Sequence, residues 1–194
     1  AYLVLQVQDN EVEYGTRLDY QDTNFDEALQ KEYIKINAYK DRAQTTELPF
    51  IEESVEGLNE FQFFMKDYEG QMTDIGQYEI TTSKLTSDDY VIRYDSGILT
   101  INQKPVTFDE SHNDYYQFLY DGKEHGITAT VFTDDLVGKD KQEGKVEIVY
   151  EDTNKYPNSA VDVKRTDDWS VGFYTAKIRR LTCERAHNYK IDWE

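Results

Sequence analysis

The residue types that could carry chemistry in this sequence are its many acids, its three histidines and its single cysteine. Two carboxylates at a defined separation can hydrolyse a glycosidic bond, and the chain offers several adjacent acidic pairs. Because 39 of its residues are Asp or Glu, adjacent pairs are expected from composition alone and indicate solvated loops. These pairs are Glu52-Glu53, Asp88-Asp89, Asp134-Asp135 and Asp167-Asp168.

Candidate ligands for a metal ion lie in one charged loop and are Asp134, Asp135 and Asp140. Calcium binds where several oxygen ligands converge, and the Asp-x-Asp-x-Asp-Gly arrangement of a calcium loop is missing from the sequence. We therefore predict no cofactor, with calcium at these three aspartates as the alternative.

Histidine and cysteine chemistry have no local signature. His112, His125 and His187 each lack a second histidine or a cysteine at the spacing of zinc ligands. Cys183 has no partner for an internal disulfide, and we expect a half-buried strand thiol rather than a nucleophile. The sequence has no phosphate-binding glycine loop, nucleophile elbow or zinc-protease motif. We predict that the protein is not an enzyme.

Composition limits the class of protein. The 21 basic and 39 acidic residues give a net charge of −18, which disfavours nucleic acids and anionic membranes as partners. With 16 tyrosines and nine phenylalanines, the chain should fold around aromatic rings. Trp169 and Trp193 could supply the stacking platforms of a carbohydrate binder, although packing at a strand end is the alternative for Trp169.

Most of the elements that would position these residues are predicted to be strands. Apolar residues alternate with polar ones in segments 1–8, 75–85, 90–94 and 99–101, and again in 126–132, 144–152 and 172–181. Asp95-Ser96-Gly97 predicts a hairpin turn between two of them. Segment 134–145 predicts a solvated loop, and Pro105 predicts a junction over residues 104–111.

One helix is predicted within this β pattern. Phe25, Leu29, Tyr33 and Ile36 follow one another at helical spacing, so the pattern predicts a helix over Phe25 to Ala38. Asn24 precedes this run and should cap its first turn.

Similar sequence marks occur in both halves of the chain at offsets of about a hundred residues. Tyr14-Gly15, Gly76-Gln77-Tyr78 and Asp89-Tyr90-Val91-Ile92 correspond to Tyr120-Asp121-Gly122, Gly172-Phe173-Tyr174 and Asn188-Tyr189-Lys190-Ile191. We predict two tandem small domains, residues 1–104 and 105–194, in a mostly β (α+β) chain.

The order of these marks resembles a known family. "EYG", "IGQYEI", "DYVI" and "SGILTINQK" resemble the MBG-type modules of bacterial surface adhesins, and "YDGKEHGITATV" resembles the start of related modules. His125 would then belong to a module start rather than to an active site. Mucus-binding repeats of lactobacilli and other Gram-positive bacteria have two such sub-domains. The helix-like insert at Phe25 to Ala38 departs from the MBG pattern and favours the ubiquitin-like β-grasp reported for those repeats, with an Ig-like β-sandwich as the alternative.

The resemblance implies a repeat unit of a secreted cell-surface adhesin, anchored to the cell wall through regions outside this sequence. Its expected partners are host mucin glycoprotein or glycans, immunoglobulin as a secondary candidate, and neighbouring repeats. The alternatives are a structural spacer that binds nothing and a carbohydrate-active fragment. Contact residues are not predicted from the sequence.

Overall fold

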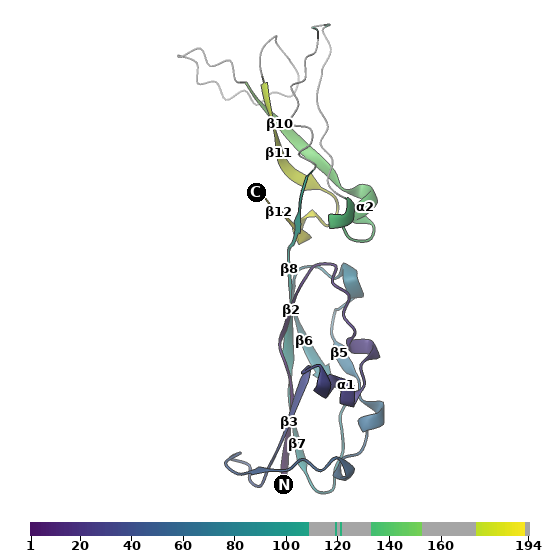
Figure 1. The fold of residues 1–194 in the computed structure, drawn as a ribbon, viewed down its shortest axis with the longest axis vertical. Helices are drawn as coiled ribbons and strands as arrows, with labels where there is room; N and C mark the ends of the chain where they lie inside the picture. Colours follow the sequence, from purple (N-terminus) through teal and green to yellow (C-terminus); the bar gives the residue numbers. More distant parts are fainter. Residues whose placement is uncertain (109–118, 120, 122–132, 153–173, 193–194) are drawn as a thin grey trace. The chain divides into compact units, whose positions relative to one another are not determined.

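The computed structural model describes residues 1–108, 119, 121, 133–152 and 174–192 (Figure 1). Contacts between Cα atoms divide the chain into two compact units, Ala1–Gln103 and Lys104–Glu194. The described elements are mostly β-strands, as predicted. No helix among the described residues is both long and apolar enough to cross a membrane.

The first unit contains eight strands and one α-helix, joined by short 3-10 turns. The strands are β1 (Tyr2–Val7), β2 (Asn10–Glu13), β3 (Ile34–Tyr39), β4 (Glu47–Leu48), β5 (Phe63–Met65), β6 (Gly76–Thr82), β7 (Val91–Asp95) and β8 (Gly97–Asn102). The helix is α1 (Phe25–Gln30), and the 3-10 turns are η1 (Tyr20–Asp22), η2 (Glu52–Ser54), η3 (Leu58–Glu60) and η4 (Gly70–Met72).

These strands form two four-stranded sheets, in the orders β4-β3-β1-β7 and β2-β8-β6-β5. Strand β1 pairs in parallel with β7, and β2 pairs in parallel with β8. Segments 2–13 and 91–102 therefore run side by side, and each passes from the first sheet into the second. Leu3, Leu5 and Val7 are buried, as their alternation predicts.

The predicted hairpin at Asp95-Ser96-Gly97 is wrong, because β7 and β8 belong to different sheets. The chain crosses between sheets here, and Gly97 packs against the β1–β2 connection. A Cβ atom at Gly97 would lie 2.6 Å from the carbonyl oxygen of Gln8. The amide of Ile98 donates to Asp9 Oδ1 at 2.8 Å, which ties the two crossing segments together.

Helix α1 begins where the sequence predicts but ends earlier. Asn24 accepts a hydrogen bond from the amide of Glu27 at 3.0 Å, so the predicted cap is confirmed. The extension to Ala38 is wrong, because the helix ends at Gln30 and Ile34–Tyr39 forms β3. Ile34 and Ala38 are buried on the inner side of that strand. A four-residue and a two-residue spacing of apolar residues coincide in this segment, and pairing with β1 decides between them.

A Schellman motif closes α1. The amide of Tyr33 donates to the carbonyl of Ala28 at 2.9 Å, and the amide of Glu32 donates to Leu29 at 3.1 Å. Glu32 occupies the left-handed position with φ 56°. Glycine is the usual residue there because a Cβ atom strains this conformation.

Replacing Glu32 with glycine should therefore stabilise the first unit by about 1 kcal/mol. Urea unfolding followed by circular dichroism would measure the change. The control is Gln30→Gly, which places the same residue inside the helix and should destabilise by about 1 kcal/mol. A Glu32→Gly variant that is as destabilised as Gln30→Gly would contradict the assignment of the strained position.

Aromatic rings fill the core of the first unit beside α1. The ring centroids of Tyr20 and Phe63 are 4.9 Å apart, those of Phe61 and Phe63 are 5.1 Å apart, and those of Phe25 and Phe61 are 5.5 Å apart. These pairs have the edge-to-face geometry that aromatic rings prefer. The aromatic core predicted from composition is confirmed for this unit.

The second unit has two two-stranded sheets among its described residues. They pair β10 (Lys145–Asp152) with β11 (Tyr174–Thr182), and β9 (Lys104–Val106) with β12 (Tyr189–Ile191). The helical elements are η6 (Thr133–Asp135), α2 (Asp140–Glu143) and η7 (Ala186–Asn188).

Two predictions for the second unit need correction. Residues 104–106 were expected in a junction but form β9, in which Pro105 is tolerated because a two-stranded sheet consists of edge strands only. Segment 134–145 was expected to be a solvated loop, yet Leu136 is 2% and Asp140 is 1% exposed. The buried carboxylate has a partner from β12, which a local charge pattern cannot reveal.

The described parts of the two units have one strand pairing in common. In each, the first strand pairs in parallel with a late strand, β1 with β7 and β9 with β12. A buried tyrosine stands at the start of each late strand, Tyr90 in one unit and Tyr189 in the other. Each hydroxyl accepts a hydrogen bond from a distant backbone amide, that of Ile51 at 3.3 Å and that of Val137 at 2.9 Å. The two tyrosines belong to the sequence marks Asp89-Tyr90-Val91-Ile92 and Asn188-Tyr189-Lys190-Ile191, and the internal repeat stays a prediction.

Candidate functional site

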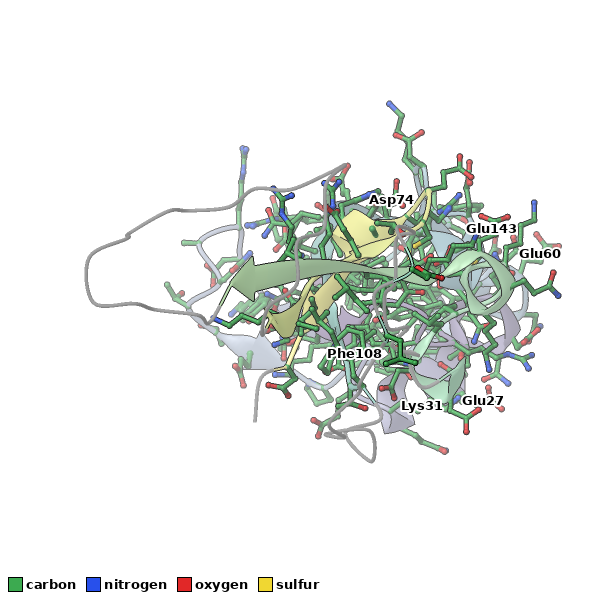
Figure 2. The ribbon with its side chains drawn as sticks, turned by 90° about the horizontal axis from the view of Figure 1, so that it is seen from above. Glu27, Lys31, Glu60, Asp74, Phe108 and Glu143 are labelled. Atoms are coloured by element: carbon green, nitrogen blue, oxygen red, sulfur yellow. The ribbon has the colours of Figure 1, made fainter. Side chains whose placement is uncertain are left out.

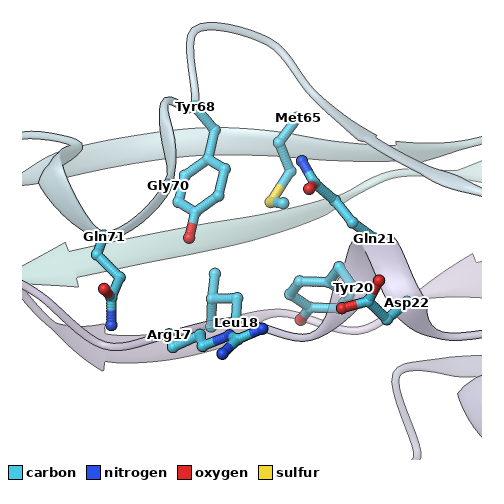
Figure 3. Close-up of a pocket in the computed structure, with 9 residues that line it drawn as sticks. All are labelled: Arg17, Leu18, Tyr20, Gln21, Asp22, Met65, Tyr68, Gly70 and Gln71. Carbon is cyan, nitrogen blue, oxygen red and sulfur yellow. The ribbon is translucent and has the colours of Figure 1, made fainter.

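A cleft of about 280 Å³ lies in the first unit between two connections, the one from β2 to α1 and the one from β5 to β6. Figure 3 shows the side chains of one connection facing those of the other. The lining residues are Arg17, Leu18, Tyr20, Gln21, Asp22, Met65, Tyr68, Gly70 and Gln71.

Asp19 positions the wall formed by the β2–α1 connection. Its carboxylate accepts hydrogen bonds from Lys31 Nζ at 2.7 Å and from the Tyr33 hydroxyl at 2.8 Å. These hydrogen bonds lower the pKa of Asp19, while burial and the nearby carboxylate raise the pKa of Tyr33 to about 12. The Asp19 carbonyl also accepts from Thr23 Oγ1 at 2.8 Å. The connection is thereby tied to the end of α1.

Tyr20 forms the floor of the cleft and belongs to the aromatic core. It is 2% exposed, and its ring centroid is 4.6 Å from that of Tyr33. Its hydroxyl accepts a hydrogen bond from Asn10 Nδ2 at 3.2 Å. Burial raises the pKa of Tyr20, so the floor is a neutral ring at physiological pH.

The opposite wall is held by hydrogen bonds around Thr73. The Thr73 hydroxyl accepts from the amide of Glu69 at 2.8 Å and donates to the carbonyl of Gly70 at 2.7 Å. The hydroxyl of Tyr14 donates to Sδ of Met72 at 3.7 Å, which joins this connection to the β2 end of the other one. These hydrogen bonds hold the backbone on both sides of Gly70, in the connection that carries Tyr68 and Gln71.

Several polar side chains of the cleft make no hydrogen bond to the described residues. In the part of the chain that the structure describes, the side chains of Arg17, Gln21, Tyr68 and Gln71 make no hydrogen bond. The first two and Gln71 are exposed, and Tyr68 is half-buried. Burial raises the pKa of Tyr68, which keeps its hydroxyl protonated as a donor. The cleft thus combines apolar surface with uncommitted hydrogen-bonding groups, the composition of a small-molecule binding site.

The predicted metal ligands do not form one cluster. Asp135 Oδ2 accepts from the amide and the hydroxyl of Thr107 at 2.8 and 2.6 Å. Asp140 Oδ2 accepts from the Tyr189 hydroxyl at 2.7 Å, whereas Asp134 is exposed. Over the described ranges, no three His, Cys, Asp or Glu residues are arranged to hold a metal ion.

Other predicted residues are dispersed. Cys183 follows β11 and is half-buried, and burial, followed by the charge of Asp140, raises the pKa of its thiol. His187 is exposed in η7. Asp89 accepts from Ser54 Oγ at 2.8 Å beside the exposed pair Glu52-Glu53.

The remaining predicted residues lie outside the described part of the chain. They are His112, His125, Asp167-Asp168, Trp169, Trp193 and most of Tyr120–Val131.

Sequence reasoning did not predict the cleft. Apart from Met65 at the end of β5, its lining residues lie in "RLDYQD" and "KDYEGQ", which have neither strand nor helix periodicity. The available signal was a tyrosine beside acids and amides in each of two irregular segments. Nothing local indicates that segments almost fifty residues apart face each other.

Comparison of the chain with protein-family models, with curated proteins and with solved structures gave no match.

Proposed function

We propose that this chain is a non-enzymatic repeat unit of a bacterial cell-surface adhesin that binds host mucus glycoproteins, with immunoglobulin as a second partner. Regions outside this sequence would anchor it to the cell wall of a Gram-positive bacterium. Contacts from successive units would add through avidity, so each unit needs only weak affinity.

The observation that carries this proposal is the plan shared by the two units. Among the described residues, a parallel pair of first and late strands with a buried tyrosine at the start of the late strand is found in both of them. Duplicated modules are the building material of extended arrays. A parallel pair with a helix between β1 and β3 also favours a ubiquitin-like β-grasp over an Ig-like sandwich, since the latter is built from antiparallel sheets.

The charge of the whole chain supports a protein that works exposed to solvent. Many of its acids lie on the surface, and Figure 2 labels three exposed ones, Glu60, Asp74 and Glu143. A net charge of −18 keeps the chain soluble at the high local density of an array. It also leaves the described apolar and amide-lined cleft as a more suitable contact for neutral ligands than for anions.

Retention of the chain on a mucin-coated surface would test the proposal against its main rival, a spacer that binds nothing. We expect the chain to be retained above an unrelated protein of the same size and net charge, and the retention to survive 0.5 M NaCl, because neutral contacts are not screened by salt. Retention equal to that of the control protein would favour the spacer.

A further inference from the structure

The cleft in the first unit offers a specific place for a ligand. Tyr68 and Met65 extend from one wall toward Leu18 and Tyr20 on the other, so rings and aliphatic groups line its interior (Figure 3). Gln71 and Gln21 lie toward its two ends. This distribution suits a ligand that is apolar on its faces and rich in hydroxyls at its edges.

We propose that this cleft binds one or two neutral sugar rings of a glycan. A sugar ring has C–H faces that pack on aromatic side chains and hydroxyls that exchange hydrogen bonds with amides and guanidinium groups. A volume of about 280 Å³ lies just below the usual range for small-molecule sites, which limits the ligand to this size. The inference rests on the proposed function and assigns its glycan contact to named residues.

Charge distinguishes this ligand from an anion. Among the described lining residues Arg17 is the one cation and Asp22 the one acid, so this lining is close to neutral. The chain around it carries a net charge of −18. A sulfate or phosphate group would gain one cation and meet one carboxylate within a repelling field. A neutral saccharide loses nothing to that field.

The polar side chains of the cleft also favour a saccharide ligand. The side chains of Arg17, Gln21, Tyr68 and Gln71 make no hydrogen bond among the described residues, yet the backbone of both walls is held in place. The backbone that carries these donors and acceptors is already positioned, so binding a ligand has to order their side chains alone. Arg17 would donate to ring hydroxyls, and the amides would both donate and accept.

The two methionines of the chain provide a direct test, because one lines the cleft and the other does not. Met65 is in the lining, whereas Met72 contacts the Tyr14 hydroxyl. The whole chain, labelled with ¹³C at its methionine methyl groups, is titrated with neutral O-glycans released from gastric mucin. We expect the Met65 methyl signal to shift in a saturable manner and the Met72 signal to shift less.

Variants make the assignment specific. Tyr68→Ala should weaken the apparent affinity about tenfold through loss of the ring, and Tyr68→Phe should weaken it less. The matched control is Tyr78→Phe, whose hydroxyl donates to the carbonyl of Asp74 outside the lining and whose loss should leave glycan affinity unchanged. Unchanged methyl spectra without ligand would show that each variant is folded.

The arms of the experiment separate failure of the cleft from failure of the proposed function. A static Met65 signal, with retention on mucin intact, overturns the cleft but leaves the adhesive function standing. A static signal with no retention overturns both. A Met65 shift with enzymatically deglycosylated mucin polypeptide, but not with released glycans, assigns the cleft to a peptide and also overturns the saccharide proposal.

Discussion

Replacing Gly97 with alanine is expected to destabilise the first unit by about 3 kcal/mol, because the new methyl group would meet backbone rather than a movable side chain. The added Cβ would lie 2.6 Å from the carbonyl oxygen and 2.9 Å from the carbonyl carbon of Gln8. Relief of this overlap requires separation of the two segments that cross between the sheets. Those segments include β1 and β8, whose Leu5 and Leu99 are fully buried.

The ¹³C-methyl signals of Met65 and Met72 would measure this effect during urea unfolding, since both residues lie in the first unit. The control is Ser96→Ala at the neighbouring exposed position, which should change stability by less than about 0.5 kcal/mol. If Gly97→Ala and Ser96→Ala unfolded at the same urea concentration, the close approach of the two crossing segments would be wrong.

Loss of the Tyr189 hydroxyl should have a comparable effect in the second unit. This hydroxyl donates to Asp140 at 2.7 Å and accepts from the amide of Val137 at 2.9 Å. Both Tyr189 and Asp140 are buried, so water cannot easily replace either bond. We expect Tyr189→Phe to cost about 3 kcal/mol, because a hydrogen bond to a buried carboxylate and one to a backbone amide are lost together.

The corresponding tyrosine of the first unit is a matched control. Tyr90 accepts one hydrogen bond, from the amide of Ile51 at 3.3 Å, and Tyr90→Phe should cost about 1 kcal/mol. Hydrogen exchange at the amides of Val137 and Ile51 would report each loss where it occurs. Equal losses in the two variants would show that Asp140 contributes nothing to the role of Tyr189.

Local patterns in the sequence were sufficient for about half of the described strands. Leu3, Leu5 and Val7 alternate with polar residues and form β1, and the alternating segments at residues 75–85 and 144–152 contain β6 and β10. The Asn24 cap was likewise predictable, since its hydrogen bond spans only three residues. Such features depend on neighbours along the chain.

Features that depend on distant residues were not predictable. Asp95-Ser96-Gly97 has the composition of a hairpin turn, and only the approach of Gln8 shows that the glycine serves a crossing between sheets. Ile34 and Ala38 continue a helical spacing, but pairing with β1 makes them part of a strand. Asp140 lies in a segment that the sequence predicts to be a solvated loop, and only the fold brings the Tyr189 hydroxyl to its carboxylate. The cleft combines all these difficulties, because its two walls are irregular and far apart in sequence.

Residence on mucin of a three-copy tandem protein, compared with that of the single chain, tests the central claim most directly. If each copy binds, the three-copy tandem protein should stay on mucin at least about a hundredfold longer than the single chain, because the second and third contacts become intramolecular. The same tandem protein with Tyr68→Ala in every copy should lose most of that gain in residence time. Residence that is identical for one copy and three would contradict the account and leave the chain a spacer.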